Sequence, residues 1–307
     1  MKMKRIPAVT LYCALSGLLL FFLLDANALR ESGRAALALC AHTVIPALLP
    51  FLIVSRLLIH LGFGPWLGRR FAWLMGPLFR LPGSGAAALL LGFLGGYPIG
   101  AETAAALYNE GQLTKEEAER LLHFCSNSNP VFFLSVLGLG VFRNIRVGLW
   151  LWLIHLLSAL LSGIFFRGRG NAPLSVSGSS FQCLSLSLPA ALAKSIREGA
   201  FTMLNISVCV VFFSMLLSPI LTLAGDGAAL PVGLVELFSM IPLLVPDRRG
   251  LVLAALCSGW GGLSVLSQTA AVLEGSGLSI RAYAEGKALQ ALLSALLALL
   301  LCPMVFP

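Results

Sequence analysis

Charged residues are scarce in this sequence of 307 residues: they make up 11% of the chain, whereas 58% of it is hydrophobic. A soluble globular domain carries about a quarter charged residues and under half apolar ones. The mean hydropathy is +0.92. These values disfavour a soluble enzyme, a disordered regulator and a fibrous protein. They predict an integral membrane protein whose first partner is the lipid bilayer.

The sequence also lacks the motifs of several chemistries. Aspartate occurs only at positions 25, 226 and 247, and neither a G-x-x-x-x-G-K-[ST] phosphate loop nor an H-E-x-x-H metal motif is present. The seven cysteines form no C-x-x-C pair, which disfavours a disulfide framework and a zinc site. The net charge of +8 comes from basic residues between apolar runs, without the cluster that nucleic acid requires. We therefore expect no enzymatic activity, no cofactor, no metal and no nucleic-acid partner.

Long runs without Asp, Glu, Lys or Arg identify the membrane segments. They cover residues 6–24, 35–55, 81–101, 121–142, 147–166, 199–225, 250–273 and 288–307. Two further apolar segments, 57–79 and 227–246, are interrupted by charged residues. Since a helix needs about 20 apolar residues to cross the hydrocarbon core, we predict an all-α polytopic membrane protein with about eight to ten membrane segments, some broken or re-entrant.

The ends of the apolar runs suggest how the chain is organised. A basic start precedes the run 6–24, as in a signal peptide, but the run is long and further spans follow, so we predict an uncleaved first helix. Lys2, Lys4 and Arg5 then place the N-terminus in the cytoplasm. The expected units are an N-terminal membrane helix at 1–30, a first repeat at 31–166, a Ser-rich linker at 167–193 and a second repeat at 194–307.

The repeat is visible in the sequence itself. Residues 95–107 read GGYPIGAETAAAL and residues 261–273 read GGLSVLSQTAAVL, so that six of thirteen positions match at an offset of 166. Composition alone would give about one or two matches. Paired halves around a site near the midplane are typical of secondary transporters. An odd number of crossings in each half would invert the second copy, which is our hypothesis; an old duplication without functional symmetry is the alternative.

The first candidate site is a break in the membrane segment 81–107. Glycine and proline disfavour a helix interior, and they gather here at Gly95, Gly96, Pro98 and Gly100, around Tyr97. Broken backbone at membrane depth is tolerated only inside protein or beside a water-filled cavity. Glu102 and Thr103 follow the break, and we expect the segment to bind substrate. The alternative is that the glycines only allow close helix packing.

The second candidate site is the polar stretch Asn127, Ser128, Asn129 and Pro130 inside the run 121–142. Asparagine at membrane depth is costly unless it has partners. We expect these side chains to contact a substrate or ion; repair of a helix break at the proline is the alternative. The counterpart of this stretch in the second half retains only Ser294 as a polar residue, so the two copies cannot contribute equally.

The second half adds Gly261, Gly262, Gln268 and Thr269 as candidate binding residues that face the first site. An isolated carboxylate inside a membrane segment is a candidate proton or cation site, and Glu236 is the most isolated one in the chain. Glu102 and Glu236 are therefore the candidate coupling residues. A structural ion pair of Glu236 with Arg69 or Arg70 is the competing interpretation.

Four stretches of the first half carry a family resemblance. They read GFLGGYPIGA at 92–101, LYNEG at 107–111, EEAERLL at 116–122 and FCSNSNP at 124–130. This pattern resembles the sporulation integral membrane protein YlbJ family, which carries the gate or nucleoside-recognition domain also found in nucleoside transporters and ferrous-iron transport proteins. Asn129 departs from the family pattern, where a small residue such as glycine is expected.

The resemblance implies a protein of the sporulating cell's membranes, either the bacterial cell membrane or the outer forespore membrane. It implies movement of dipicolinic acid from the mother cell toward the forespore, and other sporulation membrane proteins or a second copy of the chain as candidate partners. Its motif residues point to a substrate site at Gly95, Gly96, Tyr97, Pro98, Gly100, Asn127, Ser128 and Pro130.

We therefore expect a secondary transporter or conduit for a small organic anion. Three other functions stay open on the sequence alone. The gate domain suggests a transporter of nucleosides or other small solutes. A non-transporting membrane scaffold in spore envelope assembly would depend on the linker 167–189 and not on Asn127 or Glu102. A membrane enzyme fits least, because the sequence contains no nucleophile–base or metal constellation.

Overall fold

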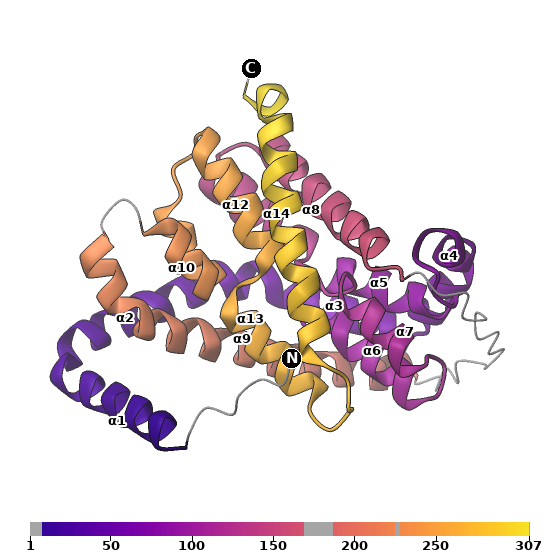
Figure 1. The fold of residues 1–307 in the computed structure, drawn as a ribbon, viewed down its shortest axis with the longest axis horizontal. Coiled ribbons are helices and arrows are strands. Elements are labelled where there is room, and N and C mark those ends of the chain that lie inside the picture. Colours follow the sequence, from indigo (N-terminus) through magenta and orange to yellow (C-terminus); the bar gives the residue numbers. More distant parts are fainter. Residues whose placement is uncertain (1–7, 169–186, 225–227, 307) are drawn as a thin grey trace.

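The computed structural model describes residues 8–168, 187–224 and 228–306, and every regular element within these ranges is a helix (Figure 1). The first half contains α1 (Ala8–Leu24), α2 (Ala26–Leu39), the π-helical η1 (Cys40–Val44), α3 (Ile45–His60), α4 (Phe63–Phe79), α5 (Gly85–Gly95), α6 (Ile99–Asn109), α7 (Lys115–Leu122), the π-helical η2 (Phe132–Val141) and α8 (Ile145–Phe165). The second half contains α9 (Leu188–Ala224), α10 (Ala229–Val235), α11 (Leu237–Met240), the 3₁₀ turn η4 (Ile241–Leu243), α12 (Arg248–Trp260), α13 (Gly262–Leu273) and α14 (Ile280–Val305).

Five helical stretches are long and apolar enough to cross a membrane. They are Ala26–Leu58, Ile145–Phe165, Leu188–Ser218, Arg248–Leu273 and Ile280–Val305. Each overlaps one of the apolar runs of the sequence. The predicted runs 81–101 and 121–142 contain only the shorter apolar helices Gly85–Gly95 and Phe132–Val141. The protein is therefore an integral membrane protein, all-helical in its described residues, in which the runs 81–101 and 121–142 contain no helix of span length.

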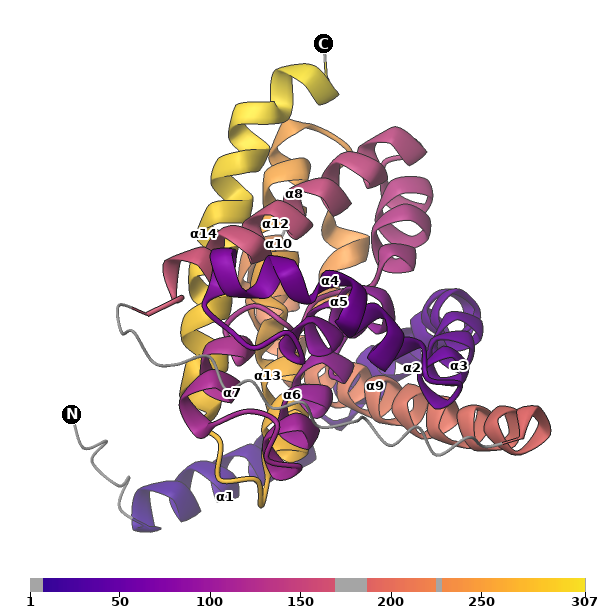
Figure 2. The same ribbon diagram turned by 90° about the vertical axis from the view of Figure 1, so that its right-hand side faces the viewer.

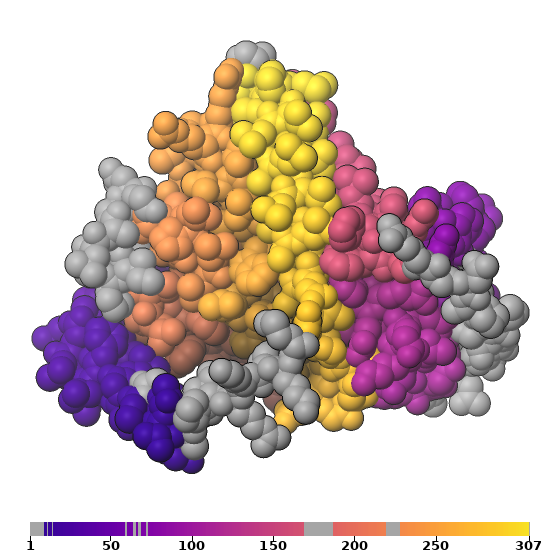
Figure 3. All heavy atoms as spheres, in the orientation of Figure 1, coloured from indigo at the N-terminus to yellow at the C-terminus, as the bar shows by residue number. Residues whose placement is uncertain are grey.

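Helix α14 is the central element of one half of the molecule. It packs between α12 and α8, and the three run side by side in both ribbon views (Figures 1 and 2). Helix α9 packs on α2 and α3 and runs across the direction of α14 (Figure 2). In the space-filling view, α14 forms a continuous band between α12 and α8 (Figure 3). Its outer side carries exposed leucines such as Leu296, Leu299 and Leu300, as expected of a lipid-facing surface.

Both halves contain a helix pair that is broken at a glycine pair. Helix α5 ends at Gly95, and Gly96 has φ 83°; helix α12 ends at Trp260, and Gly261 has φ 87°. These left-handed backbone conformations suit glycine because it has no Cβ. The break predicted in the segment 81–107 is thus found between α5 and α6, and the equivalent residues of the second half form α12 and α13.

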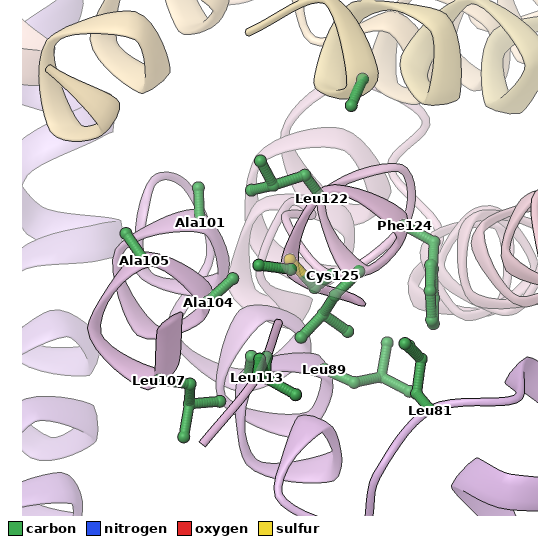
Figure 4. Close-up of a cluster of buried hydrophobic side chains, with 14 of the residues drawn as sticks. Leu81, Leu89, Ala101, Ala104, Ala105, Leu107, Leu113, Leu122, Phe124 and Cys125 are labelled. Carbon is green, nitrogen blue, oxygen red and sulfur yellow. The ribbon is translucent and has the colours of Figure 1, made fainter. Parts of the chain in front are cut away.

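Small residues allow these helices to approach closely. A Cβ on Gly259 of α12 would lie 2.8 Å from Ala291 Cα of α14, and a Cβ on Gly286 of α14 would overlap the backbone of His123. An apolar cluster fills the space around α5, α6 and α7, including Leu89, Ala104, Leu122, Phe124 and Cys125 (Figure 4). Membrane helices commonly associate through such small-residue contacts.

Two of the organisational predictions fall wholly or partly on residues outside the described ranges. The predicted first membrane helix forms α1, but Lys2, Lys4 and Arg5, on which the orientation of the N-terminus was based, lie outside the description. Most of the predicted linker 167–193 also lies outside it. Helix α9 begins at Leu188, which is earlier than the predicted linker end.

The close approach of α14 to His123 gives a first prediction. Gly286→Ala should lower the free energy of unfolding by about 1–3 kcal/mol, because the added methyl group has no room against the His123 backbone. Gly17→Ala is the matched control, since no atom lies within 4 Å of the added Cβ. Thermal unfolding of the two purified variants in detergent checks this, and equal melting temperatures would contradict the packing.

Candidate functional site

The two polar stretches predicted in the first half lie against each other. A Cβ on Gly92 or on Gly100 would overlap the carbonyl of Cys125, and a Cβ on Gly96 would lie 3.1 Å from Asn129 Nδ2. The α5–α6 break therefore packs on the segment 125–129, which has no regular structure. Gly92 and Gly100 allow this close packing, and the substrate role predicted for Gly100 stays a prediction. The Tyr97–Pro98 peptide bond between the helices is cis.

Asn127 belongs to a buried polar cluster that joins the two halves of the chain. Its Oδ1 accepts hydrogen bonds from Lys287 Nζ at 3.3 Å and from Gln290 Nε2 at 3.0 Å. Lys287 Nζ also donates to Gln290 Oε1 at 2.6 Å and to the Tyr97 hydroxyl at 3.2 Å. Asn127 Nδ2 donates to the Phe124 carbonyl at 2.7 Å, which orients the amide. We refer to Tyr97, Asn127, Lys287 and Gln290 as the lysine cluster.

Helix α8 supports this cluster with a buried polar face. His155 Nε2 accepts a hydrogen bond from the Ser128 backbone N–H at 3.2 Å, and Gln290 Nε2 lies 3.4 Å from the His155 carbonyl. Ser294 Oγ donates to Ser158 Oγ at 2.8 Å one turn further along. The His155 ring thus accepts the backbone N–H of Ser128, which has no helical carbonyl to bind in this non-helical segment. Its role here is to satisfy backbone that the membrane interior leaves without water.

Asn129 and Pro130 form the start of the next helical stretch. Asn129 Oδ1 accepts a hydrogen bond from the Phe132 N–H at 2.9 Å, and Pro130 is the first helical residue. Asparagine is a favourable N-cap, and proline is favourable at the first helical position because its missing N–H would be unpaired there. The helix-break interpretation therefore describes these two residues, whereas Asn127 belongs to the lysine cluster.

A cavity of about 50 Å³ lies between the broken segments of the two halves, and we call it the inner cavity. It is lined by Leu48, Tyr97, Ser128, Asn129, Phe132, Ile206, Val210, Glu236, Leu237, Phe238, Ser264, Val265 and Gln268. Five of these residues were predicted as site residues from the sequence: Tyr97, Ser128, Asn129, Glu236 and Gln268. A cavity of this size holds a few water molecules and is smaller than the roughly 300 Å³ of a small-molecule pocket.

A second cavity of about 600 Å³ lies beyond Gln268, and we call it the outer cavity. It is lined by Arg56, Pro98, Glu102, Thr202, Leu204, Asn205, Val208, Cys209, Ser267, Gln268, Ala271 and Val272. Gln268 lines both cavities, and Pro98 of the outer wall directly follows Tyr97 of the inner wall. The outer cavity has the size of a small-molecule site, which is about 300–1,000 Å³.

Charged side chains of α3 and α6 line one wall of the outer cavity, and a carboxylate of α9 joins their ion-pair network. Arg56 of α3 pairs with Glu102 of α6 at 3.0 Å and lies 3.8 Å from Glu198 of α9. His60 Nε2 lies 2.8 Å from the same Glu198 carboxylate. The Glu102 side chain is 46% exposed and lies at the mouth of the cavity. It has a partner there in Arg56. This ion-pair network links the three helices and is not a substrate contact by itself.

Glu236 occupies the break between α10 and α11 and is buried. Its side chain accepts a hydrogen bond from the Ser239 N–H and so caps α11. Arg69 and Arg70 are exposed on α4, and no ion pair joins either of them to Glu236 in the part of the chain that the structure describes. The predicted structural pairing is therefore not the arrangement found. Glu236 is a buried carboxylate that faces the inner cavity.

The remaining predicted residues lie near the cavities without lining them. The Thr103 hydroxyl donates to the Ile99 carbonyl within its own helix at 2.8 Å, and a Cβ on Gly95 would meet the Ile99 side chain. Gly261 packs against the Tyr97 ring, since its Cβ would lie 3.3 Å from the hydroxyl oxygen. Gly262, the first residue of α13, and the buried Thr269 shape the second-half break.

Sequence reasoning missed Lys287 and Gln290, the two residues of α14 in the lysine cluster. Lys287 directly precedes the run 288–307, and charged residues mark the ends of such runs. A signal was present: Tyr283, Lys287, Gln290 and Ser294 recur at spacings of four, three and four residues. That spacing places polar side chains on one face of an otherwise apolar helix, and polar groups in a membrane helix face the protein interior.

Metal binding has no support from side-chain positions within the described ranges. No group of three or more His, Cys, Asp or Glu side chains there is arranged to hold a metal ion. The polar groups of the lysine cluster and the inner cavity are amides, hydroxyls, one ammonium and one carboxylate.

The cap formed by Asn129 gives a second prediction. Asn129→Ala should lower the free energy of unfolding by about 1 kcal/mol, because the Phe132 N–H loses its buried acceptor. Asn129→Ser should retain most of the stability, since a serine hydroxyl also caps a helix. Thermal unfolding of the two variants in the same detergent measures the difference. An Asn129→Ala variant as stable as the unchanged chain would show that the cap is dispensable.

Comparisons with known proteins agree with these features over part of the chain. A family model described as Gate: Nucleoside recognition matches residues 41–146. The sporulation integral membrane protein YlbJ of Bacillus subtilis (strain 168) is 38% identical over 141 residues, which cover 46% of this chain and 35% of that protein. The aligned part thus spans about a third of that relative's length. No solved structure matches the chain at a significant level.

Residues 41–146 contain all four stretches that carry the predicted resemblance. They also contain Tyr97, Asn127 and Ser128, which line the inner cavity or belong to the lysine cluster. Together, the family model and the relative confirm the predicted resemblance of this chain to the YlbJ family of sporulation integral membrane proteins.

Proposed function

We propose that the chain is a membrane transporter or conduit for a small organic anion. One observation carries this proposal: an outer and an inner cavity share Gln268 and are lined by the broken segments of both halves. Broken helices around a site at the repeat interface are typical of secondary transporters. In a bilayer, such non-helical backbone is tolerated where it lines a water-filled cavity.

The two cavities suggest successive positions of the cargo. The outer cavity, at about 600 Å³, has room for a small organic molecule, whereas the inner cavity, at about 50 Å³, has room only for water. Cargo would enter the outer cavity first. It would reach the inner cavity only when the two broken segments move apart around Gln268. The arrangement described here would then be one state of an alternating-access cycle.

The repeat architecture is part of this proposal, with units at 1–30, 31–166, 167–193 and 194–307. At the offset of 166, the broken pair α5–α6 corresponds to α12–α13, and α7 corresponds to the start of α14. This correspondence supports two repeats. The repeats differ in one region, since α14 continues as one helix where the first copy breaks at 125–129. We propose that the second repeat is inverted and that the short helices bring the membrane segments to about eight to ten.

The cargo we propose is dipicolinic acid, moved toward the forespore. Support comes from the sporulation role in the name of the Bacillus subtilis relative, which matches 46% of this chain. The host membrane would be the bacterial cell membrane or the outer forespore membrane, with the N-terminus in the cytoplasm. Dipicolinate is a flat aromatic dianion. Its carboxylates can be held by amides such as Asn127 and Gln268 and by hydroxyls such as Ser128. Its ring can stack on the Tyr97 ring.

Glu236 is the better of the two proposed coupling residues. It is buried and lines the inner cavity, whereas Glu102 is half exposed and paired with Arg56. An ionised Glu236 would repel an anion in the same small cavity, because like charges interact strongly where water is excluded. Binding of an anionic cargo would then favour the protonated form of Glu236. This linkage would couple anion movement to a proton.

A second candidate function is transport of nucleosides or other small neutral solutes. The match of residues 41–146 to the nucleoside-recognition family model favours it. Competition distinguishes the two functions, because uridine would inhibit dipicolinate uptake only if both share the site. A scaffold that recruits other sporulation membrane proteins, or a homodimer, would instead tolerate changes at Gln268.

The proposed path gives a third prediction. Liposomes that contain the purified chain should take up dipicolinate with saturable kinetics, and Gln268→Leu should reduce the rate at least tenfold, because this side chain lines both cavities. Arg281→Gln is the control, since its side chain is exposed on α14 and pairs only within that helix. Uptake that is absent under every imposed ion gradient, with folded protein, would contradict the transport proposal.

The coupling residue gives a fourth prediction. In Glu236→Gln, dipicolinate flux should continue but should no longer respond to an imposed pH gradient, because the amide cannot bind or release a proton. The amide oxygen can still accept the Ser239 N–H, so the α11 cap should persist. Glu102→Gln should leave the pH response unchanged. A pH response that survives in Glu236→Gln would assign coupling to another group.

A further inference from the structure

Lys287 is the charged member of the lysine cluster, and its relative exposure is 0%. It lies in α14, within the candidate membrane span Ile280–Val305. The Nζ atom donates to three oxygens, on Gln290, Tyr97 and Asn127. It also lies 5.0 Å from the centre of the Tyr97 ring. The ammonium is therefore well solvated by neutral groups.

Neutral acceptors satisfy the N–H groups of an ammonium, but they leave its charge uncompensated. Within residues 8–168, 187–224 and 228–306, none of the ion pairs includes Lys287. The neighbouring carboxylate of Glu285 pairs with Arg281 on the exposed side of α14. A buried charge without an opposite charge is costly in a membrane protein, and such residues commonly mark a substrate or ion pathway.

Two further polar groups beside the cluster have unused hydrogen-bonding capacity. The hydroxyls of Ser126 and Ser258 are buried, and neither has a hydrogen-bond partner among the residues that the structure describes. Ser126 directly precedes Asn127 in the chain, and the Ser258 carbonyl accepts the Tyr97 hydroxyl at 3.4 Å. Buried polar atoms are nearly always paired, so two orphaned donors next to an uncompensated cation indicate a missing acceptor.

Tyr97 connects this region to the inner cavity. Its hydroxyl accepts from Lys287, and the same residue lines the cavity beside Ser128 and Gln268. One aromatic side chain thus separates the ammonium from the cavity. A positive charge at this distance acts strongly on an anion in the cavity, because the surroundings contain little water to screen it.

We propose that Lys287 is the anion-selecting residue of the path. A carboxylate of the cargo in the inner cavity pairs with the Lys287 ammonium, either through the Tyr97 hydroxyl or in its place, and supplies the ion-pair partner that Lys287 lacks among the described residues. This inference rests on the proposed function, since it assigns the recognition of an anionic cargo to one residue. The inference also gives α14 a role in binding, although the binding residues predicted from the sequence included none from this helix.

Two variants of the full chain test this assignment. Lys287→Met removes the charge and keeps an unbranched side chain in the same space. Gln290→Glu keeps the shape and introduces a carboxylate next to the ammonium, where Gln290 Oε1 now lies at 2.6 Å. The second variant should remain folded, because it supplies a partner for the buried charge. Arg281→Gln, on the exposed side of the same helix, is the control.

The measurement is calorimetric titration of each purified chain with pyridine-2,6-dicarboxylate, with pyridine-2,6-dimethanol as the uncharged probe. We expect the unchanged chain and Arg281→Gln to bind the dicarboxylate and to prefer it to the diol. Both Lys287→Met and Gln290→Glu should bind the dicarboxylate at least tenfold more weakly. Melting temperatures without ligand should stay close to that of the unchanged chain for Gln290→Glu, which separates loss of binding from loss of fold.

The possible failures are distinguishable. If the two variants bind the dicarboxylate as tightly as the unchanged chain, Lys287 is a structural cross-link and this inference is wrong, while the transport proposal stands. If the unchanged chain neither binds nor moves the dicarboxylate but moves uridine, the anion proposal fails, and the role of Lys287 fails with it.

Discussion

Lys287 is hydrogen-bonded at once to Tyr97, to Asn127 and, within its own helix, to Gln290. Much of the structure depends on this one buried ammonium, because it ties the non-helical segment of the first half to the long last helix of the second. Removing any of its acceptors would leave a charge in the membrane interior with fewer partners. The α5–α6 break, the segment 125–129 and α14 are thereby held at one place.

The scarcity of water in the membrane interior explains how the broken segments are built. Each interruption of a helix frees backbone groups, and in the membrane interior these need partners within the protein. Asn129 accepts the Phe132 N–H, His155 accepts the Ser128 N–H, and Glu236 accepts the Ser239 N–H. Polar residues that are costly at membrane depth are therefore the residues that make the breaks possible. Because the breaks are stable, cavities can form between them.

Charge is distributed unevenly around these cavities, and this distribution limits what the path can accept. At the outer cavity, Arg56 pairs with Glu102 and lies near Glu198, and Lys194 also lies 3.8 Å from Glu198, so that two cations face two carboxylates. Further inside, the inner cavity is lined by the Glu236 carboxylate and lies one tyrosine ring away from the Lys287 ammonium. A cargo with one or two carboxylates would be attracted by the Lys287 ammonium and repelled by the Glu236 carboxylate. Selection of an anion and a response to protons would then arise from the same small space.

The sequence by itself determined that the protein is helical and membrane-embedded, because apolar runs of span length have no other stable form in a bilayer. It also determined where the helices break, since the glycines and prolines at 95–100, 130 and 261–262 act locally. Only the tertiary structure decided which polar residue has which role. Asn127 and Asn129 stand two positions apart, yet one contacts Lys287 and the other caps a helix. Lys287 escaped sequence reasoning because its partners Asn127 and Tyr97 lie 160 and 190 residues away, and only the packing of α14 against the first half brings them together.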